Sequence, residues 1–156
     1  MKFRFIWPGS NAEPEFGNAI EKYLERIRHF VPIEVLEIRP EKGRQQKNDA
    51  AIMHAQSARL IEAIPPRGLR VVLDERGGML DSLKFSKWLE KLTIEQPHGV
   101  NFIMGGDLGM DDAVRQAADK LIALSPMTMP HELARVVLLE QIYRACTLMR
   151  NIRYHK

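Results

Sequence analysis

Val-Asn-Phe-Ile-Met-Gly-Gly-Asp-Leu-Gly, residues 100–109, joins a short apolar run directly to a glycine loop. A second apolar run ends in Leu-Ser-Pro-Met-Thr-Met-Pro-His, residues 124–131, and one long helical pattern then closes the chain. Both loops follow predicted strands. In open α/β sheets, ligands bind outside the carboxyl ends of the strands, so the two loops predict one pocket.

Working outward, strand-like and helix-like patterns alternate along the whole chain. The alternation predicts a mostly parallel sheet with helices on both faces, in a single domain spanning residues 1–156. Gly77-Gly78 is expected to turn the chain, and Asp81 or Ser82 to cap the following helix. The expected strands are 3–7, 33–38, 69–73, 100–104 and 121–124, and the expected helices are 14–29, 48–63, 82–94, 111–117 and a final helix from about 131.

The composition is ordinary for a globular protein. Hydrophobic residues make up 45% and charged residues 28% of the 156 residues, and 23 Lys+Arg against 20 Asp+Glu give a net charge of +3. This mildly basic balance permits a nucleic-acid partner without requiring one. A single cysteine, Cys146, excludes an intrachain disulfide and fits a reducing, cytoplasmic setting.

Several classes of function are disfavoured. No apolar run approaches the ~20 residues of a membrane span, and the first residues are expected to form a strand rather than a signal peptide. The histidines lack the spacing of metal ligands: His131-Glu132 starts like a zinc-protease motif, but Arg135 stands where that motif needs histidine. No metal site is therefore expected.

The glycine loop indicates what kind of ligand it can approach. Its spacing matches neither the dinucleotide fingerprint nor the Walker loop, and Asp107, Asp111 and Asp112 would repel a phosphate. Sugar hydroxyls or a positive centre suit it better, although the loop could be only a tight turn with capping aspartates. The loop at residues 124–130 has two prolines and could border a flat adenine ring, or could simply be a stiff connection.

Other charged segments have open interpretations. Asp74-Glu75 could place a carboxylate at the ligand-binding edge, but a solvated turn is the favoured interpretation. The basic loop of Lys42, Arg44 and Lys47 could meet phosphates, and the tail Arg150 to Lys156 combines positive charge with an aromatic ring, as RNA-binding segments do. Apolar residues cover more than one stripe of the final helix, which predicts burial on several sides, most simply at a subunit interface.

Taken together, the motifs resemble one family. They are Gly-Gly-x-x-Gly at 105, Leu-Ser-x-Met-Thr-x-Pro-His at 124, Arg-x-x-Leu-x-Glu-Gln-x-Tyr-Arg-Ala at 135, and the terminal Tyr-His-Lys. This order resembles the SPOUT-class ribosomal large-subunit RNA pseudouridine N3-methyltransferases of the RlmH type. The resemblance spans essentially the whole chain and is strongest from residue 102 onward.

The resemblance implies a fold and an activity. The expected fold is an α/β domain with a C-terminal trefoil knot, working as a cytoplasmic homodimer. The expected activity is S-adenosylmethionine-dependent methylation of N3 of a pseudouridine in 23S ribosomal RNA, on the assembled ribosome. By matching motif, the cofactor contacts fall on Leu73, Gly105, Leu124, Ser125, Pro126, Met127, Thr128 and Met129, and the substrate-side or catalytic residues are His131, Arg135, Tyr143, Arg144, Tyr154 and His155.

The chain departs from the family pattern at three places. Gly78 stands where lysine is common, Pro8-Gly9-Ser10 replaces a Gly-Lys, and Arg153 stands where many members have proline. The alternative function is a non-catalytic α/β ribosome- or RNA-binding module. A signalling receiver is disfavoured because no acidic pair follows the first strand, and a flavin binder because Asp107 would oppose the flavin phosphate.

Overall fold

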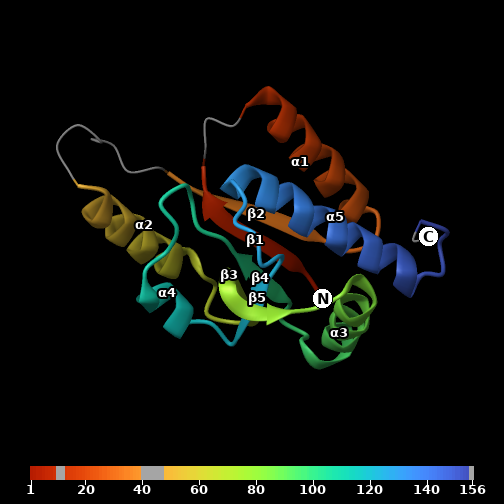
Figure 1. Cartoon of the computed structure of the whole chain (residues 1–156). Helices are drawn as coiled ribbons and strands as arrows, with labels where there is room; N and C mark the ends of the chain where they lie inside the picture. The colour runs from red at the N-terminus through yellow and green to blue at the C-terminus, as the bar shows by residue number, and fades with distance from the viewer. Residues whose placement is uncertain (10–12, 40–47, 155–156) are drawn as a thin grey trace.

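The computed structural model describes residues 1–9, 13–39 and 48–154. Strands and helices alternate through these residues in the expected order (Figure 1). The elements are β1 (Phe3–Pro8), α1 (Pro14–Arg28), β2 (Ile33–Ile38), α2 (Asp49–Ala63), β3 (Leu69–Met79), α3 (Ser82–Glu95), β4 (Val100–Ile103), α4 (Asp112–Gln116), β5 (Lys120–Ala123) and α5 (His131–Met149).

Among the described residues, five strands form one sheet in the order β2-β1-β4-β3-β5. Every strand pair in it is parallel. The predicted α/β class is therefore confirmed. Because the strands are parallel, the segments that follow β1, β3, β4 and β5 all leave from the same edge of the sheet.

The sheet separates two apolar cores, since successive side chains of a strand point to opposite faces. Phe3, Phe5 and Trp7 of β1 join the core that α1, α3 and α5 cover, whereas Ile6 joins the core beneath α2 and α4. Figure 1 shows these two helix groups on opposite sides of the sheet. Layers of this kind bury the strands on both faces, which explains their nearly continuous apolar sequence.

Side-chain caps fix the beginnings of three helices. Asn48 accepts a hydrogen bond from the Ala51 amide at α2, and Asp81 accepts one from the Lys84 amide at α3, both within 2.8 Å. Asp111 accepts from two amides at α4. Of the two caps that the sequence predicted, Asp81 or Ser82, the structure has Asp81, whose carboxylate satisfies amides that have no partner inside the helix.

The prediction that Gly77-Gly78 turns the chain is wrong. Strand β3 continues to Met79, with Leu73 and Gly78 both paired to Ile122 of β5. The four residues between these two pairing points, 74–77, form a bulge out of the ladder. Gly77 permits it: a Cβ there would lie 2.5 Å from the Ile122 nitrogen. Glycine thus brings two backbones together instead of reversing the chain.

Helix α5 lies across one face of the sheet between α1 and α3, and packs on both. Its buried residues include Leu138, Leu139, Ile142 and Ala145. Much of the wide apolar surface of this helix is therefore covered inside one chain, whereas Leu133 in its first turn stays exposed. In the part of the chain that the structure describes, no helix combines the length and apolar character of a membrane span.

Candidate functional site

A cavity of about 290 Å³ opens at the carboxyl edge of the sheet. The ends of β3, β4 and β5 and the first turn of α5 surround it, which is where the strand-end loops predicted a pocket. Its walls are mostly apolar or backbone, with a few charged side chains. The lining residues are Leu73, Asp74, Glu75, Met104, Gly105, Gly106, Gly109, Met110, Arg115, Ile122, Leu124, Ser125, Met127, Thr128, Met129, His131 and Ala134.

Seven of the eight residues predicted to contact a cofactor lie in this lining: Leu73, Gly105, Leu124, Ser125, Met127, Thr128 and Met129. Pro126 belongs to the same loop but not to the cavity wall. Three separate stretches of the sequence thus converge on one space. Gly106 and Gly109 of the glycine loop join them there.

The glycine loop is folded tightly against the residues that follow it. A Cβ on Gly105 would lie 2.7 Å from Met110 Cγ and 2.9 Å from the Gly109 oxygen. Gly109 has a φ of +77°, and its amide donates to the Gly106 carbonyl at 3.0 Å. Glycine is needed at 105 because a side chain there would separate the two sides of the loop, and at 109 because other residues rarely adopt its positive φ.

The loop between β5 and α5 forms the opposite wall. Ser125 Oγ accepts a hydrogen bond from the Met127 amide at 2.9 Å, which closes a local turn. Pro126 lies inside this turn and Pro130 follows it, and both prolines restrict the backbone of the loop. The side chain of Met127 remains 76% exposed, whereas Met129 is half-buried. The loop therefore offers a fixed backbone and an adaptable apolar rim.

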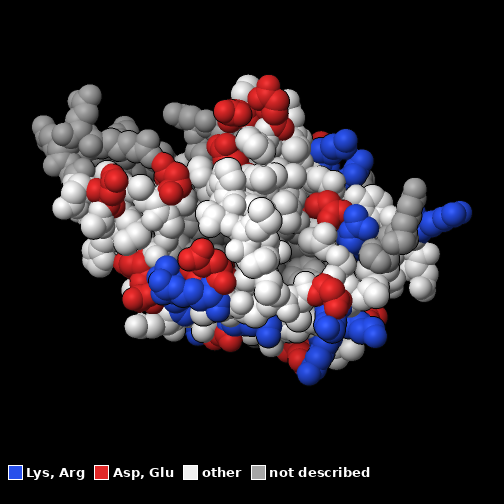
Figure 2. Space-filling model, in the orientation of Figure 1, with Lys and Arg blue, Asp and Glu red and all other residues white. Residues whose placement is uncertain are grey.

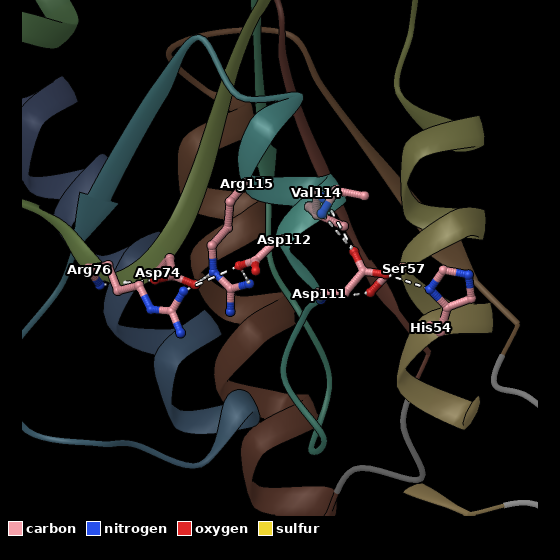
Figure 3. A network of polar contacts seen from close by, with 9 residues as sticks. His54, Ser57, Asp74, Arg76, Asp111, Asp112, Val114 and Arg115 are labelled. Atoms are coloured by element: carbon pink, nitrogen blue, oxygen red, sulfur yellow. Dashed lines mark hydrogen bonds and ion pairs between the residues drawn. The ribbon is translucent and has the colours of Figure 1, made fainter. Parts of the chain in front are cut away.

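Asp74 and Arg115, which both line the cavity, form an ion pair that Figure 3 shows from close by. Asp74 accepts a 2.8 Å hydrogen bond from Arg115 Nε of α4 and a 2.9 Å bond from the Arg76 amide. Its side chain is only 7% exposed. Arg115 also binds Asp112 at 2.9 Å. The interpretation of Asp74 as part of a solvated turn is thus wrong, because the bulge in β3 carries it into the cavity wall.

Arg115 is the charged lining residue that sequence reasoning missed. The available signal was weak: an arginine three residues after Asp112, in the short helix that follows the glycine loop. Nothing local connects it with Asp74, since only the sheet order brings α4 beside the end of β3.

A second polar network, on the α2 side of Figure 3, holds the beginning of α4. His54 Nδ1 lies 2.9 Å from Asp111 Oδ2, and the Asp111 amide donates to Ser57 Oγ at 3.0 Å. Because the serine hydroxyl accepts from a backbone amide and does not contact His54, this is no nucleophilic triad. The network connects α2 to α4 and so supports the helix that carries Arg115.

His131 lies at the beginning of α5 and lines the cavity. Its side chain is 22% exposed. Burial, with a contribution from the nearby Arg135 cation, lowers the pKa of His131 below its usual 6.5. At neutral pH the imidazole is therefore uncharged and can accept a proton.

Arg135 lies one turn further along α5 but does not line this cavity. It is 2% exposed, its Nη2 donates to the Pro8 carbonyl at 2.7 Å, and its guanidinium lies 5.3 Å from the centre of the Trp7 ring. Burial lowers the pKa of Arg135 to about 10. Its contacts thus hold α5 to the end of β1, and it faces a second cavity of about 440 Å³ beside α1.

Tyr143, Arg144 and Tyr154 lie together, towards the opposite end of α5 and away from the cavity lining. The rings of Tyr143 and Tyr154 are 4.9 Å apart, and the Arg144 guanidinium lies 4.8 Å from the Tyr154 ring. Glu140 binds both Arg144 and the Tyr154 hydroxyl. His155, also predicted as a site residue, lies outside the described residues, as does the basic loop of Lys42, Arg44 and Lys47.

Across residues 1–9, 13–39 and 48–154, no three His, Cys, Asp or Glu side chains are grouped to hold an ion.

Comparisons with known proteins agree over nearly the full length. A family model described as "Predicted SPOUT methyltransferase" matches residues 1–155. Proteins named "Ribosomal RNA large subunit methyltransferase H" from Trichlorobacter lovleyi and from Geobacter sp. (strain M21) are 38% and 40% identical, each alignment covering 99% of both chains.

Solved structures share the fold at much lower identity. A probable methyltransferase from Bordetella pertussis superposes with a TM-score of 0.58 at 15% identity, over 92% of this chain and 93% of that one. A probable methylase family protein from Haemophilus influenzae gives a TM-score of 0.57 at 8% identity, over 99% of this chain and 70% of that one.

Proposed function

The chain belongs to the SPOUT methyltransferase family, and from this premise we propose that it methylates N3 of a pseudouridine in 23S ribosomal RNA, using S-adenosylmethionine. The observation that carries the proposal is the cavity at the carboxyl edge of the sheet. The segments at the ends of β3, β4 and β5 that match the family motifs all line this cavity. The RNA target rests on the names of the full-length relatives and on the motif resemblance.

The residues around the cavity fit S-adenosylmethionine chemically. Leu73, Met104, Ile122 and Met129 supply apolar surface for a flat heterocycle, and the backbone of the loop at 124–129 supplies hydrogen-bonding groups for its edge. Glu75 and the Asp74–Arg115 pair leave the wall without excess positive charge. Such a wall favours sugar hydroxyls and a sulfonium centre, and disfavours phosphates.

When bound, S-adenosylmethionine supplies a methyl group on a sulfonium sulfur, which becomes a neutral thioether once the methyl carbon bonds to N3. The chain must hold the base in line with that carbon and receive the N3 proton. Neutral His131, at the cavity wall, is the group that accepts this proton or orients the base. The target base must also leave its stack, at a cost of a few kcal/mol.

We further propose that the protein works as a cytoplasmic homodimer on the assembled ribosome, with the chain threaded as a C-terminal trefoil knot. The proposed partner would cover exposed apolar residues near the cavity, namely Met127 and Leu133. Figure 2 supports this: a broad uncharged area crosses the middle of the face on which α5 begins. Tyr143, Arg144, Tyr154 and His155 are proposed to act on the RNA side.

The first test is calorimetric titration of the purified protein with S-adenosylmethionine in the absence of RNA. We expect saturable binding that Gly105→Trp abolishes, because even a Cβ at Gly105 meets Met110 and Gly109. Gly78→Trp is the matched control, since a Cβ there has no neighbour within 4 Å and Gly78 lies outside the cavity wall.

The second test is transfer of a labelled methyl group to ribosomes that lack the modification. Incorporation into 23S ribosomal RNA at N3 of a pseudouridine is the expected result. If millimolar cofactor does not bind and no methyl is transferred, the proposal is wrong and the non-catalytic RNA-binding module replaces it.

A further inference from the structure

The bulge in β3 places two consecutive carboxylates, Asp74 and Glu75, at the cavity wall, and the structure treats them differently. Asp74 is almost fully buried and its charge is compensated by Arg115 at 2.8 Å. Glu75 is exposed, lines the same cavity and forms no ion pair with another described residue. The first carboxylate is therefore a structural part of the wall, and the second remains available to a ligand.

The other charged lining residues do not neutralise Glu75. Arg115, the single lining cation among the described residues, is shared between Asp74 and Asp112. His131 lines the cavity in its uncharged form, because burial disfavours its cation. The lining thus carries a net negative charge at pH 7, and Glu75 is its source.

We propose that Glu75 is a specificity-determining residue, whose carboxylate makes this cavity bind the cationic methyl donor more tightly than its neutral product. The inference rests on the proposed function and deepens it. S-adenosylmethionine and S-adenosylhomocysteine share the adenine, ribose and amino-acid groups, and differ in the methyl group and the sulfonium charge. A wall of apolar and backbone groups alone would barely distinguish the two, whereas a carboxylate responds to the charge.

The selectivity has a consequence for turnover. Loss of the positive charge during transfer removes the attraction to Glu75, so the product leaves a cavity that no longer favours it. The attraction to Glu75 therefore strengthens binding of the donor without slowing release of the uncharged product.

The experiment measures the dissociation constants of S-adenosylmethionine and S-adenosylhomocysteine by calorimetry for the wild type, Glu75→Gln and Glu62→Gln. Glu62 is an exposed residue of α2 outside the cavity, so its variant matches the change in net charge. We expect Glu75→Gln to weaken donor binding about three- to tenfold, as befits a partly solvated charge pair, and to change product binding less than about twofold. Glu62→Gln should change neither.

A second measurement uses the wild-type protein alone, in case Glu75→Gln folds poorly. Raising the salt from about 50 mM to about 500 mM should reduce the preference for donor over product, because salt screens an exposed carboxylate. A preference for donor over product that did not change with salt would overturn the inference. Equal weakening of donor and product binding in Glu75→Gln would also overturn it, and would mean that Glu75 contacts groups that the two ligands share. If neither ligand binds the wild type, the proposed function fails and this inference fails with it.

Discussion

Arg115 Nε donates a hydrogen bond to Asp74 Oδ2 at 2.8 Å although 41 residues separate them in sequence. The contact joins α4, which follows the glycine loop, to the bulge in β3. Two walls of the cavity are thereby fixed relative to each other. Because Asp74 is only 7% exposed, its carboxylate depends on this partner.

Arg115→Met should therefore destabilise the protein strongly. Removing the guanidinium leaves a buried carboxylate with only the Arg76 amide, and we expect the free energy of unfolding to fall by about 2–4 kcal/mol. Arg76→Met is the matched control: its 3.3 Å pair with Asp112 is exposed and should contribute less than about 1 kcal/mol. Urea unfolding measures the change in both variants. Similar losses of unfolding free energy would contradict the argument that Arg115 compensates the charge of Asp74.

Gly77 and Gly78 allow a test of the close approach between β3 and β5. Gly77→Ala would place a Cβ 2.5 Å from the Ile122 nitrogen, whereas Gly78→Ala meets no atom within 4 Å. We expect Gly77→Ala to lower the unfolding free energy by about 2 kcal/mol or more, through displacement of β5, and Gly78→Ala to change it by less than about 0.5 kcal/mol. Thermal melting separates these outcomes, and equal melting temperatures would refute the packing argument.

The sequence was sufficient for the layer architecture. Alternating patterns such as Phe3 to Trp7 identified strands, and Asn48, Asp81 and Asp111 stand at the helix beginnings where capping side chains are favoured. The loops at residues 105–109 and 124–130 were placed correctly at one edge, because parallel strands bring their carboxyl ends together.

What the sequence did not reveal depends on contacts between distant residues. Gly77-Gly78 has the composition of a turn, and only the neighbouring strand β5 makes it a point of close backbone approach. Arg115 shows no sign of its partner Asp74. The breadth of apolar surface on α5 suggested a subunit interface, but α1 and α3 of the same chain cover much of it. Local patterns describe each element, whereas the sheet order decides which elements meet.

Tyr154 should anchor the last described turn of the chain. Its hydroxyl donates to Glu140 Oε1 at 3.2 Å, and burial, together with hydrogen bonding to Tyr23 and Glu140, raises the pKa of Tyr154 to about 12. Tyr154→Phe removes a hydrogen bond of about 1 kcal/mol but keeps the ring beside Tyr143. We expect faster hydrogen exchange at residues 150–154 with little change in global stability. Exchange as slow as in the wild type would show that ring packing alone holds the tail.

His131 should make stability depend on pH below neutrality. Burial lowers the pKa of His131 in the folded state below the 6.5 expected when the chain unfolds. Between these two values the unfolded state binds more protons, so the unfolding free energy falls as the pH drops from about 6.5 towards the folded pKa. His131→Gln should remove this part of the acid dependence, and His98→Gln, at an exposed position outside the cavity, should retain it. Urea unfolding at several pH values measures the slope, and unchanged slopes in His131→Gln would contradict the assignment.

The same histidine should separate cofactor binding from methyl transfer. If His131 receives the N3 proton, His131→Gln should lower kcat about 10²–10⁴-fold while changing the dissociation constant of S-adenosylmethionine less than about threefold. Because burial lowers the pKa of His131 below 6.5, wild-type transfer should begin to fall only at a pH below 6.5, and the variant should lose this dependence on a histidine pKa. Single-turnover transfer to ribosomes measures the chemical step, and calorimetry measures binding. If His131→Gln weakened cofactor binding by the same factor as it lowered the rate of transfer, His131 would be a residue that holds the cofactor. It would then have no role in the proton transfer, because loss of a base slows the reaction without weakening cofactor binding.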